Sequence, residues 1–479
     1  MINLALATIL TPFLGAVLVA LAPQPVAKTI GRSFAGLAFL AVLTLAISFA
    51  RGGMVATERA LLAYGGVEIL GFGVDRVSVL VAVAVVAIGL LVTIYSADYF
   101  SAGNREHADI GRRRFWAFIL VFIGAMAGLV FTSTVVGQLV FFEITGACSW
   151  ALIGYYEKPK ALASALKALI VTHIASLGLY VAAAVLFLST GTFALSAIGT
   201  LPAATKTIVL LAILVAAWGK SAQLPFHMWL PDAMEAPTPV SAYLHAASMV
   251  KVGVYIFARA LMSSNGAPEI VGWVGSIMAI VTLVYGFTMY LPQADLKRLL
   301  AWSTITQLSY IFLALSLSVF GSQLAFDGAI AHIFNHAFAK TLFFLVAGSL
   351  SYTAGTRLLP ILRGVLAKSP ILGIGFVVAA LAITGVPPFS GFFSKFAIFA
   401  GGFRVGDAHP ALYVLLVVAL LESVGSFAWF LKWIGHTVPG TPSETMAAAQ
   451  PVPAAMRLVL GVLIVMAVAS SFIATAWLG

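Results

Sequence analysis

The stretch HIFNHAFAK, residues 332–340, places His332, His336 and Lys340 at intervals of four residues. Residues four apart lie on the same face of an α-helix, so this spacing predicts a helix with three titratable side chains along one side. The flanking stretches, LAFDGAIA before it and TLFFLVAGSLSY after it, are largely apolar. The sequence therefore predicts ionisable groups on a helix inside a lipid bilayer, where a charge is costly.

The composition of the whole chain supports this location. Of its 479 residues, 62% are hydrophobic and 9% are charged, and a soluble protein of this size could not bury so much apolar surface. About 20 consecutive apolar residues span the hydrocarbon core as a helix. Such windows occur at residues 2–23, 31–50, 77–97, 115–132, 134–156, 165–190, 206–223, 240–263, 268–290, 294–318, 323–350, 371–402, 411–435 and 455–477. We expect an all-α integral membrane protein with about 14 transmembrane helices.

Two segments interrupt this pattern, in the seventh and twelfth helices. LPFHMWLPDAMEAPTPV contains four prolines and ITGVPPFSGFFSK contains two prolines and two glycines. Proline breaks a helix, and a break at membrane depth survives only where protein or water satisfies the freed backbone groups. Paired breaks, here five helices apart, are typical of inverted-repeat transporters, with the working site at the breaks. Two unrelated proline kinks remain the alternative.

The expected organisation is a single membrane domain, residues 1–479. Within it we expect three N-terminal helices (1–114), a first five-helix repeat (115–263), a second, inverted five-helix repeat (268–435) and a C-terminal helix (455–479). No connecting loop is long enough to fold as a second domain.

The net charge of +10 is distributed unevenly over the loops. If the N-terminus lies outside, thirteen basic residues lie in inside loops and six in outside loops, so the positive-inside rule places both termini on the periplasmic side of an inner (cytoplasmic) membrane. The excess of basic residues thus indicates the orientation of the chain in the membrane rather than nucleic-acid binding. The six outside residues are Arg51, Arg59, Arg76, Lys206, Arg259 and Arg404.

Ionisable residues recur within the expected spans, although a central charge costs at least ~2.5–3.5 kcal/mol on insertion scales. The candidate proton-transfer residues are Glu143, Lys220, His245, Lys251, Lys297, His332, His336, Lys340, Lys395 and Glu422. Some have simpler interpretations: Lys297, beside Arg298, is also compatible with a side chain that reaches the interface, and Glu422 with a structural acid. We assign His173, which has no acid nearby in sequence, to the hydrogen-bonded core.

This set of residue types favours proton transfer. Burial lowers the pKa of a lysine from about 10.4 by several units, whereas an adjacent carboxylate raises it again. A Glu–Lys pair that forms and separates is therefore a two-state proton switch, and histidines relay protons between such lysines. We expect no cofactor, no metal site and no catalysis on this chain: Cys148 is the only cysteine, HIFNH lacks a third metal ligand, and nucleotide-binding motifs are absent.

Several long strings resemble a known family. LPFHMWLPDAMEAPTPVSAYLHAASMVKVGVYIFAR, DLKRLLAWSTITQLSY, FNHAFAKTLFFLVAG and ITGVPPFSGFFSK are similar to the antiporter-like subunits of respiratory complex I, Mrp sodium/proton antiporters and group 4 membrane-bound hydrogenases. The resemblance covers about residues 70–435. With GQLVFFEITGACSWALI and the compact length, it is strongest to the D subunit of hydrogenase-4, of the formate hydrogenlyase type.

The resemblance implies fourteen spans with two inverted repeats. It assigns proton transfer to all the residues above except Glu422, with His245 beside the matching Lys251. Ser176 stands where the largest complex I antiporter-like subunit places an acid, and the chain ends at the fourteenth span without that subunit's lateral helix; both departures favour the hydrogenase branch. The implied function is a non-redox, proton-translocating subunit of a hydrogenase-4-like complex, with membrane and peripheral partner subunits performing the redox chemistry. The alternatives are a subunit of an Mrp-type Na⁺/H⁺ antiporter or of NADH:quinone oxidoreductase, and a non-transporting membrane scaffold.

Overall fold

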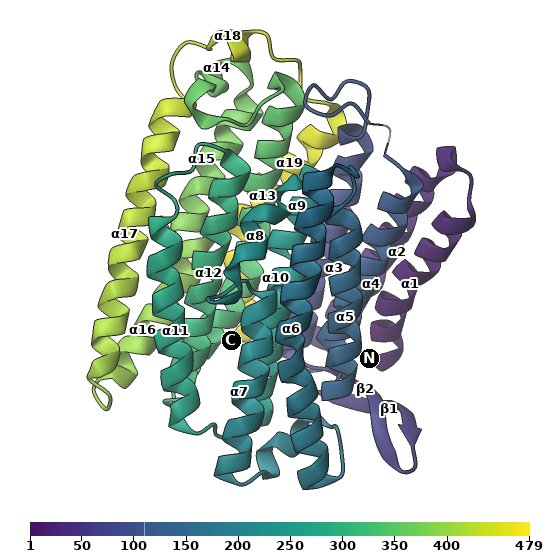
Figure 1. The fold of residues 1–479 in the computed structure, drawn as a ribbon, viewed down its shortest axis with the longest axis vertical. Helices are drawn as coiled ribbons and strands as arrows, with labels where there is room; N and C mark the ends of the chain where they lie inside the picture. The colour runs from purple at the N-terminus through teal and green to yellow at the C-terminus, as the bar shows by residue number, and fades with distance from the viewer. Residues whose placement is uncertain (110) are drawn as a thin grey trace.

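A computed structural model describes residues 1–109 and 111–479 as a bundle of helices lying side by side (Figure 1). Within these residues thirteen helical segments are long and apolar enough to cross a membrane. A fourteenth is interrupted: the apolar helix Pro370–Thr384 is followed across a short break by Ser390–Gly406. The expected all-α membrane architecture is confirmed.

The helix boundaries agree with the expected windows to within a few residues. The uninterrupted long helices are α1 (Ile2–Leu21), α2 (Gln24–Arg51), α3 (Arg76–Tyr99), α4 (Arg113–Phe131), α5 (Val135–Ile153), α6 (Pro159–Thr190), α7 (Ala203–Lys220), α11 (Glu269–Thr288), α12 (Leu296–Ser318), α13 (Gln323–Ala354), α17 (Ala411–Thr437) and α19 (Ala454–Leu478). Two spans are split, into α9 (Thr238–Ala246) with α10 (Met249–Ser263), and α15 (Pro370–Thr384) with α16 (Ser390–Gly406). Short helices and 3₁₀ turns connect them: η1 (Leu195–Thr200), η2 (Phe226–Met228), α8 (Trp229–Asp232), η3 (Ala233–Glu235), η4 (Leu359–Ile361), α14 (Val365–Lys368) and α18 (Glu444–Ala447).

Both predicted breaks are present, and a third was not expected. α7 ends at Lys220 before the first proline-rich segment, and α15 ends at Thr384 before the second. The third break separates α9 from α10 at residues 247–248, where the sequence has neither proline nor glycine. Here the Ser248 hydroxyl donates to the Tyr243 carbonyl at 2.8 Å, so a side chain replaces part of the helical hydrogen-bond ladder.

A β-hairpin between α2 and α3 was also not predicted. Its strands are β1 (Thr57–Tyr64) and β2 (Val67–Val74), which pair antiparallel. Gly65 and Gly66 form the two-residue turn with φ of 60° and 84°, the left-handed conformation that such tight hairpins require. This Gly-Gly pair between β-forming residues was a usable signal in the sequence.

The helix that carries the opening motif lies at the centre of the bundle. α13 packs against α3, α9, α12, α15, α16 and α19. Its most apolar window is 94% buried, whereas that of the peripheral α17 is 28% buried. The side chains of α13 therefore meet other helices rather than lipid, and its polar residues can find polar partners there.

The two ends of the bundle differ in the elements and in the charged residues that they hold. Both termini lie toward the end from which the β-hairpin projects (Figure 1). The opposite end holds basic loops joined by ion pairs, such as Arg357 with Glu106 and with Asp295 at 2.8 Å. Two residues that the sequence analysis placed in outside loops are bound within the protein instead. Lys206 donates to the Ser264 carbonyl at 2.8 Å, and Arg259 pairs with Asp75.

Close helix contacts depend on glycine at particular positions, which gives a test of the packing. A Cβ added at Gly253 of α10 would lie 2.1 Å from the Ala217 carbonyl oxygen of α7. Because backbone cannot yield as a flexible side chain does, we expect Gly253→Ala to lower stability by about 1–3 kcal/mol. The measurement is the thermal unfolding midpoint of the purified protein in lipid nanodiscs.

The matched control is Gly461→Ala in α19, where an added Cβ meets nothing within 4 Å. We expect this variant to unfold at the wild-type temperature or slightly above it, because alanine has the higher helix propensity. Equal midpoints for the two variants would contradict the close approach of α7 and α10.

Candidate functional site

Nine of the ten candidate residues are buried within the bundle. Their exposed fractions range from 0% at His245 and Lys340 to 4% at Lys395 and Glu422. The exception is Glu143, whose side chain is 29% exposed. Because these groups cannot reach the aqueous interface, each must be satisfied by neighbouring polar atoms. Those neighbours define the site.

The central group surrounds α13 and brings three of its residues against three other helices. His336 Nδ1 lies 3.0 Å from Lys251 Nζ of α10. One turn away, His332 Nδ1 lies 2.8 Å from Ser394 Oγ of α16. Lys340 Nζ donates to Ser303 Oγ of α12 at 2.5 Å. The stripe predicted from the four-residue spacing therefore faces a polar environment along its whole length.

His245 lies beside this group without a hydrogen bond of its own. Its ring packs against Phe344 at 4.9 Å between centroids. Within the described residues neither of its ring nitrogens has a protein partner, and the same holds for His336 Nε2. Buried polar atoms of this kind need water as a partner. We therefore expect water molecules to complete the chain of hydrogen bonds around α13.

A second group forms where α16 and α17 meet α12. Lys395 Nζ lies 4.4 Å from the centroid of the Tyr310 ring and donates to Ser423 Oγ at 3.2 Å. The Tyr310 hydroxyl donates to the Glu422 carboxylate, which also accepts from Ser426 Oγ at 2.5 Å. Tyr310 thus contacts both the base and the acid. It lies between them, and no direct ion pair joins Lys395 to Glu422.

The third group lies at α5, α6 and the end of α7. Glu143 accepts from Ser176 Oγ at 2.6 Å and contacts His173 Nδ1 at 3.1 Å. Lys220 lies close by, with its Nζ 4.3 Å from the centroid of the Phe142 ring. Gly146, three residues beyond Glu143, leaves room for that ammonium group, since an added Cβ would lie 3.1 Å from Nζ. Glu143 and Lys220 are neighbours, but the Glu143 carboxylate makes its hydrogen bonds with Ser176 and His173 rather than with Lys220.

His173 was assigned wrongly to the hydrogen-bonded core. Its side chain is 56% exposed, and it pairs with Glu143, which lies 30 residues away in the chain. The proximity arises from the antiparallel packing of α5 and α6, which sequence spacing alone does not reveal. Ser176, at the position where the largest complex I antiporter-like subunit places an acid, is uncharged. Its hydroxyl nevertheless donates a hydrogen bond to Glu143.

α12 joins the central group to the second group, a role that the sequence analysis missed. Ser303, Gln307 and Tyr310 lie at intervals of four and three residues and so share one face. Ser303 contacts Lys340, Gln307 Oε1 lies 3.2 Å from His332 Nε2, and Tyr310 contacts Glu422.

The same helix also reaches the first break. Ser309 Oγ of α12 donates at 2.7 Å to Oε1 of Gln223, three residues beyond Lys220. The concentration of polar side chains in the string WSTITQLSY, within an apolar span, was the available signal. We call the three groups together with these α12 side chains the polar network.

Lys297 occupies a separate position, at the basic end of the bundle. It is 1% exposed and donates to the carbonyls of Met234 and Ala236 at 2.9 and 2.7 Å, so it does not extend to the interface. A cavity of about 30 Å³ beside it is large enough for a water molecule and is also lined by Glu106 and His107. Burial lowers the pKa of the His107 imidazole, which favours its neutral form.

This arrangement is suited to moving protons or small cations rather than to covalent chemistry. Titratable groups on neighbouring helices are linked by hydroxyl, amide and aromatic side chains. Within residues 1–109 and 111–479 no cluster of three or more His, Cys, Asp or Glu side chains could hold a metal ion.

Sequence comparisons identify relatives of the chain. It is 34% identical over 389 residues to the A subunit of the Na⁺/H⁺ antiporter of Alkalihalophilus pseudofirmus, an alignment that covers 77% of this chain and 48% of that protein. The A1 subunit of the Staphylococcus aureus Na⁺/H⁺ antiporter is 34% identical over 385 residues, covering 76% and 47%. The chain thus spans about half the length of these curated relatives.

Structure comparisons agree. The Mrp complex from Dietzia sp. matches with a TM-score of 0.85 and 30% identity, over 97% of this chain and 50% of that chain. A chain of the membrane-bound sulfane sulfur reductase, an archaeal respiratory complex, shares the fold, with a TM-score of 0.84 and 22% identity over 99% of this chain and 95% of that one.

A family model described as NADH:quinone oxidoreductase/Mrp antiporter, TM, matches residues 132–423. All ten candidate residues lie within this range. The chain belongs to the NADH:quinone oxidoreductase/Mrp antiporter membrane family.

Proposed function

We propose that the polar network translocates protons or sodium ions, and that the chain is an antiporter-like component of a multi-subunit membrane complex. The observation that carries this proposal is that side chains on one face of α12 connect the central group to the second group. Ser303 contacts Lys340, Gln307 contacts His332, and Tyr310 contacts Glu422. A further side chain of the same helix, Ser309, bonds to Gln223, three residues beyond Lys220. Burying so many ionisable groups costs stability, which a purely structural scaffold would have no reason to accept.

The network also supports the proposed inverted repeats, residues 115–263 and 268–435. In each repeat a lysine at a helix break lies over an aromatic ring: Lys220 over Phe142 at 4.3 Å, and Lys395 over Tyr310 at 4.4 Å. Phe142 is on the second span of the first repeat and Tyr310 on the second span of the second repeat; the lysines are both on the fourth. Equivalent contacts at equivalent places are expected of related units.

Among the specific assemblies, the relatives favour an Mrp-type Na⁺/H⁺ antiporter over a hydrogenase-4-like complex, because the curated matches are named as A subunits of Na⁺/H⁺ antiporters. The second candidate, a proton-pumping subunit of a hydrogenase-4-like complex, is supported by the resemblance of the strings quoted above. Sodium-dependent proton exchange in vesicles without a redox substrate supports the first. Nickel and iron in the purified complex, with hydrogen evolution, support the second.

The chain is proposed to lie in the cell membrane with its basic loops in the cytoplasm and both termini outside. The binding of Lys206 and Arg259 within the protein supports this orientation, because it leaves fewer free positive charges at the end that holds the termini. Partner subunits are proposed to cover the side of α5 and α6, where the Glu143–His173 pair is partly exposed on membrane-spanning helices.

The first test concerns Lys220. We expect Lys220→Ala to reduce ion translocation at least tenfold while the complex still assembles, because the titratable group at the first break is lost. Proton movement is followed with a pH-sensitive dye in everted vesicles, and assembly by native gel electrophoresis. Lys432→Ala, at an exposed position on α17, is the matched control and should leave the flux unchanged. Full flux in the Lys220 variant would remove this lysine from the mechanism.

The second test concerns the hydroxyl that joins Tyr310 to Glu422. Tyr310→Phe keeps the ring beneath Lys395 but removes the hydrogen bond to the carboxylate. We expect the same flux assay to show a severalfold loss, with assembly intact.

Tyr95→Phe provides the matched control for this test. Its hydroxyl is also buried and bonded, to Leu345 O and Ser349 Oγ at 2.9 Å, but lies outside the polar network. A similar loss in both variants would show that Tyr310 contributes only to packing and stability.

A further inference from the structure

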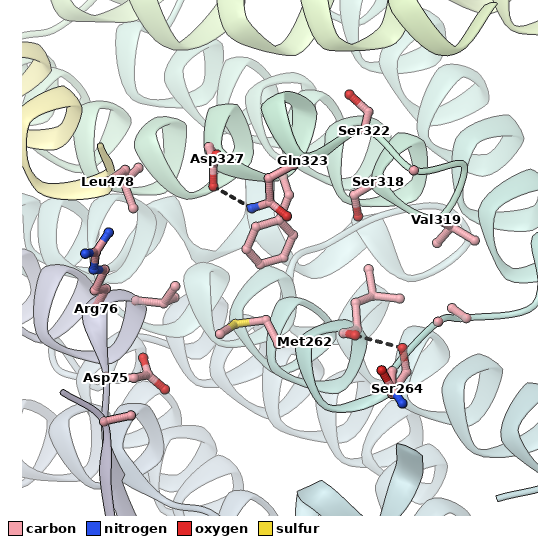
Figure 2. Close-up of a pocket in the computed structure, with 18 of the residues that line it drawn as sticks. Asp75, Arg76, Met262, Ser264, Ser318, Val319, Ser322, Gln323, Asp327 and Leu478 are labelled. Carbon is pink, nitrogen blue, oxygen red and sulfur yellow. Dashed lines mark hydrogen bonds between the residues drawn. The ribbon is translucent and has the colours of Figure 1, made fainter. Parts of the chain in front are cut away.

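A cavity of about 870 Å³ is lined by Arg76, which follows the β-hairpin, and by Leu478, next to the C-terminus, so it lies at the end of the bundle that holds these elements. Its volume greatly exceeds the roughly 10–15 Å³ that one water molecule needs. Five parts of the chain meet around it: the end of the loop after α2, the start of α3, the end of α10, the turn between α12 and α13, and the end of α19. Polar side chains line its walls, among them Asp75, Arg76, Ser264, Ser318, Gln323 and Asp327 (Figure 2).

The cavity lies at the ends of the two helices that carry the central group of the polar network. α10 contributes Leu261 and Met262 to the lining, and Lys251 lies about three turns further along it. α13 contributes Phe326 and Asp327, and His332 follows within two turns. At 1.5 Å per residue, both network residues lie within about 8–17 Å of the cavity wall along their helices.

A stripe of side chains on α10 runs between the cavity and the central group. Lys251, Tyr255 and Arg259 follow one another at intervals of four residues and so lie on one side of the helix. The stripe runs from Lys251, in contact with His336, to Arg259, which pairs with Asp75 in the cavity wall.

The middle of the stripe is also polar and buried. Between the two ends, the Tyr255 hydroxyl donates to the Val130 carbonyl at 2.5 Å. Arg259 Nε is buried and has no protein partner within the described residues, so it can bind a water molecule.

The wall formed by α13 adds a carboxylate close to the turn between α12 and α13. Asp327 accepts a hydrogen bond from Gln323 Nε2 at 2.9 Å, and both side chains project into the cavity (Figure 2). Unlike Asp75, Asp327 has no cationic partner within 4.0 Å among the described residues. A carboxylate in this position attracts small cations from the medium.

We propose that this cavity is an aqueous vestibule through which the polar network exchanges protons or hydrated monovalent cations with the medium at this end of the bundle. The Lys251–Tyr255–Arg259 stripe connects the vestibule to the network, and the Arg259–Asp75 pair stands at the boundary between them. The proposal rests on the transport function proposed above and adds the place where the ion enters or leaves.

The chain offers a direct test by thiol labelling. Its only cysteine, Cys148, is 1% exposed, so the wild-type protein gives little background. Ser318 lies in the vestibule wall and is partly exposed, and Ser318→Cys is close to isosteric. A charged methanethiosulfonate reagent then attaches a bulky group within the vestibule. We expect translocation by the assembled complex to fall at least fivefold after labelling and to return on addition of dithiothreitol.

Tyr64→Cys is the control on the same end of the molecule, at an 85% exposed position next to the tip of the hairpin. It should be labelled from the same side of the membrane without loss of flux. Gln323→Cys provides a second vestibule position if the Ser318 variant does not assemble.

The outcomes separate the two proposals. Normal flux after complete labelling at position 318, verified by mass spectrometry, would overturn the vestibule while the transport function stands. Failure of the reagent to reach that position from either side would also overturn it, because an aqueous vestibule must admit a water-soluble reagent. Absence of translocation in the unlabelled wild-type complex would instead overturn the transport function.

Discussion

The structure depends on one constraint: an ionisable side chain buried at membrane depth must find polar partners inside the protein. Nine of the ten candidate residues are almost completely buried, and several of them have partners on other helices. Lys340 depends on Ser303 of α12, His336 on Lys251 of α10, and Lys395 on Ser423 of α17. These partners are uncharged or themselves titratable, so none of the three contacts pairs a lysine or histidine with a carboxylate.

This constraint explains the arrangement of the helices. α13 lies at the centre because its histidines and lysine need neighbours on several sides. α12 packs beside it with its hydroxyl and amide side chains directed at three different titratable residues. The helix breaks lie next to Lys220, between His245 and Lys251, and before Lys395, so interruptions of the helical ladder and titratable side chains occur together. Helix breaks and titratable side chains at membrane depth both need water or polar partners, and a water-filled path for ions supplies the water.

Much of the fold could be predicted from sequence because apolar length alone determines a membrane-spanning helix. The two proline-rich breaks were equally readable, since proline removes a hydrogen-bond donor wherever it stands. The break at residues 247–248 was not, because it depends on a hydrogen bond from Ser248 that local sequence does not specify. Of the site, the charged residues could be predicted from their cost in the bilayer. Their partners could not, because His173 meets Glu143, and Tyr310 meets Glu422, only through tertiary packing.

The central claim is that ions move along titratable groups at the core of the bundle, and Lys340 is the most direct place to test it. Its side chain is fully buried, on the central helix. In proteoliposomes that contain the assembled complex, proton flux is measured for Lys340→Met and for Lys368→Met, an exposed control. Our account predicts that the first variant loses most of its flux while the second retains it. Wild-type flux through the Lys340 variant would contradict the account.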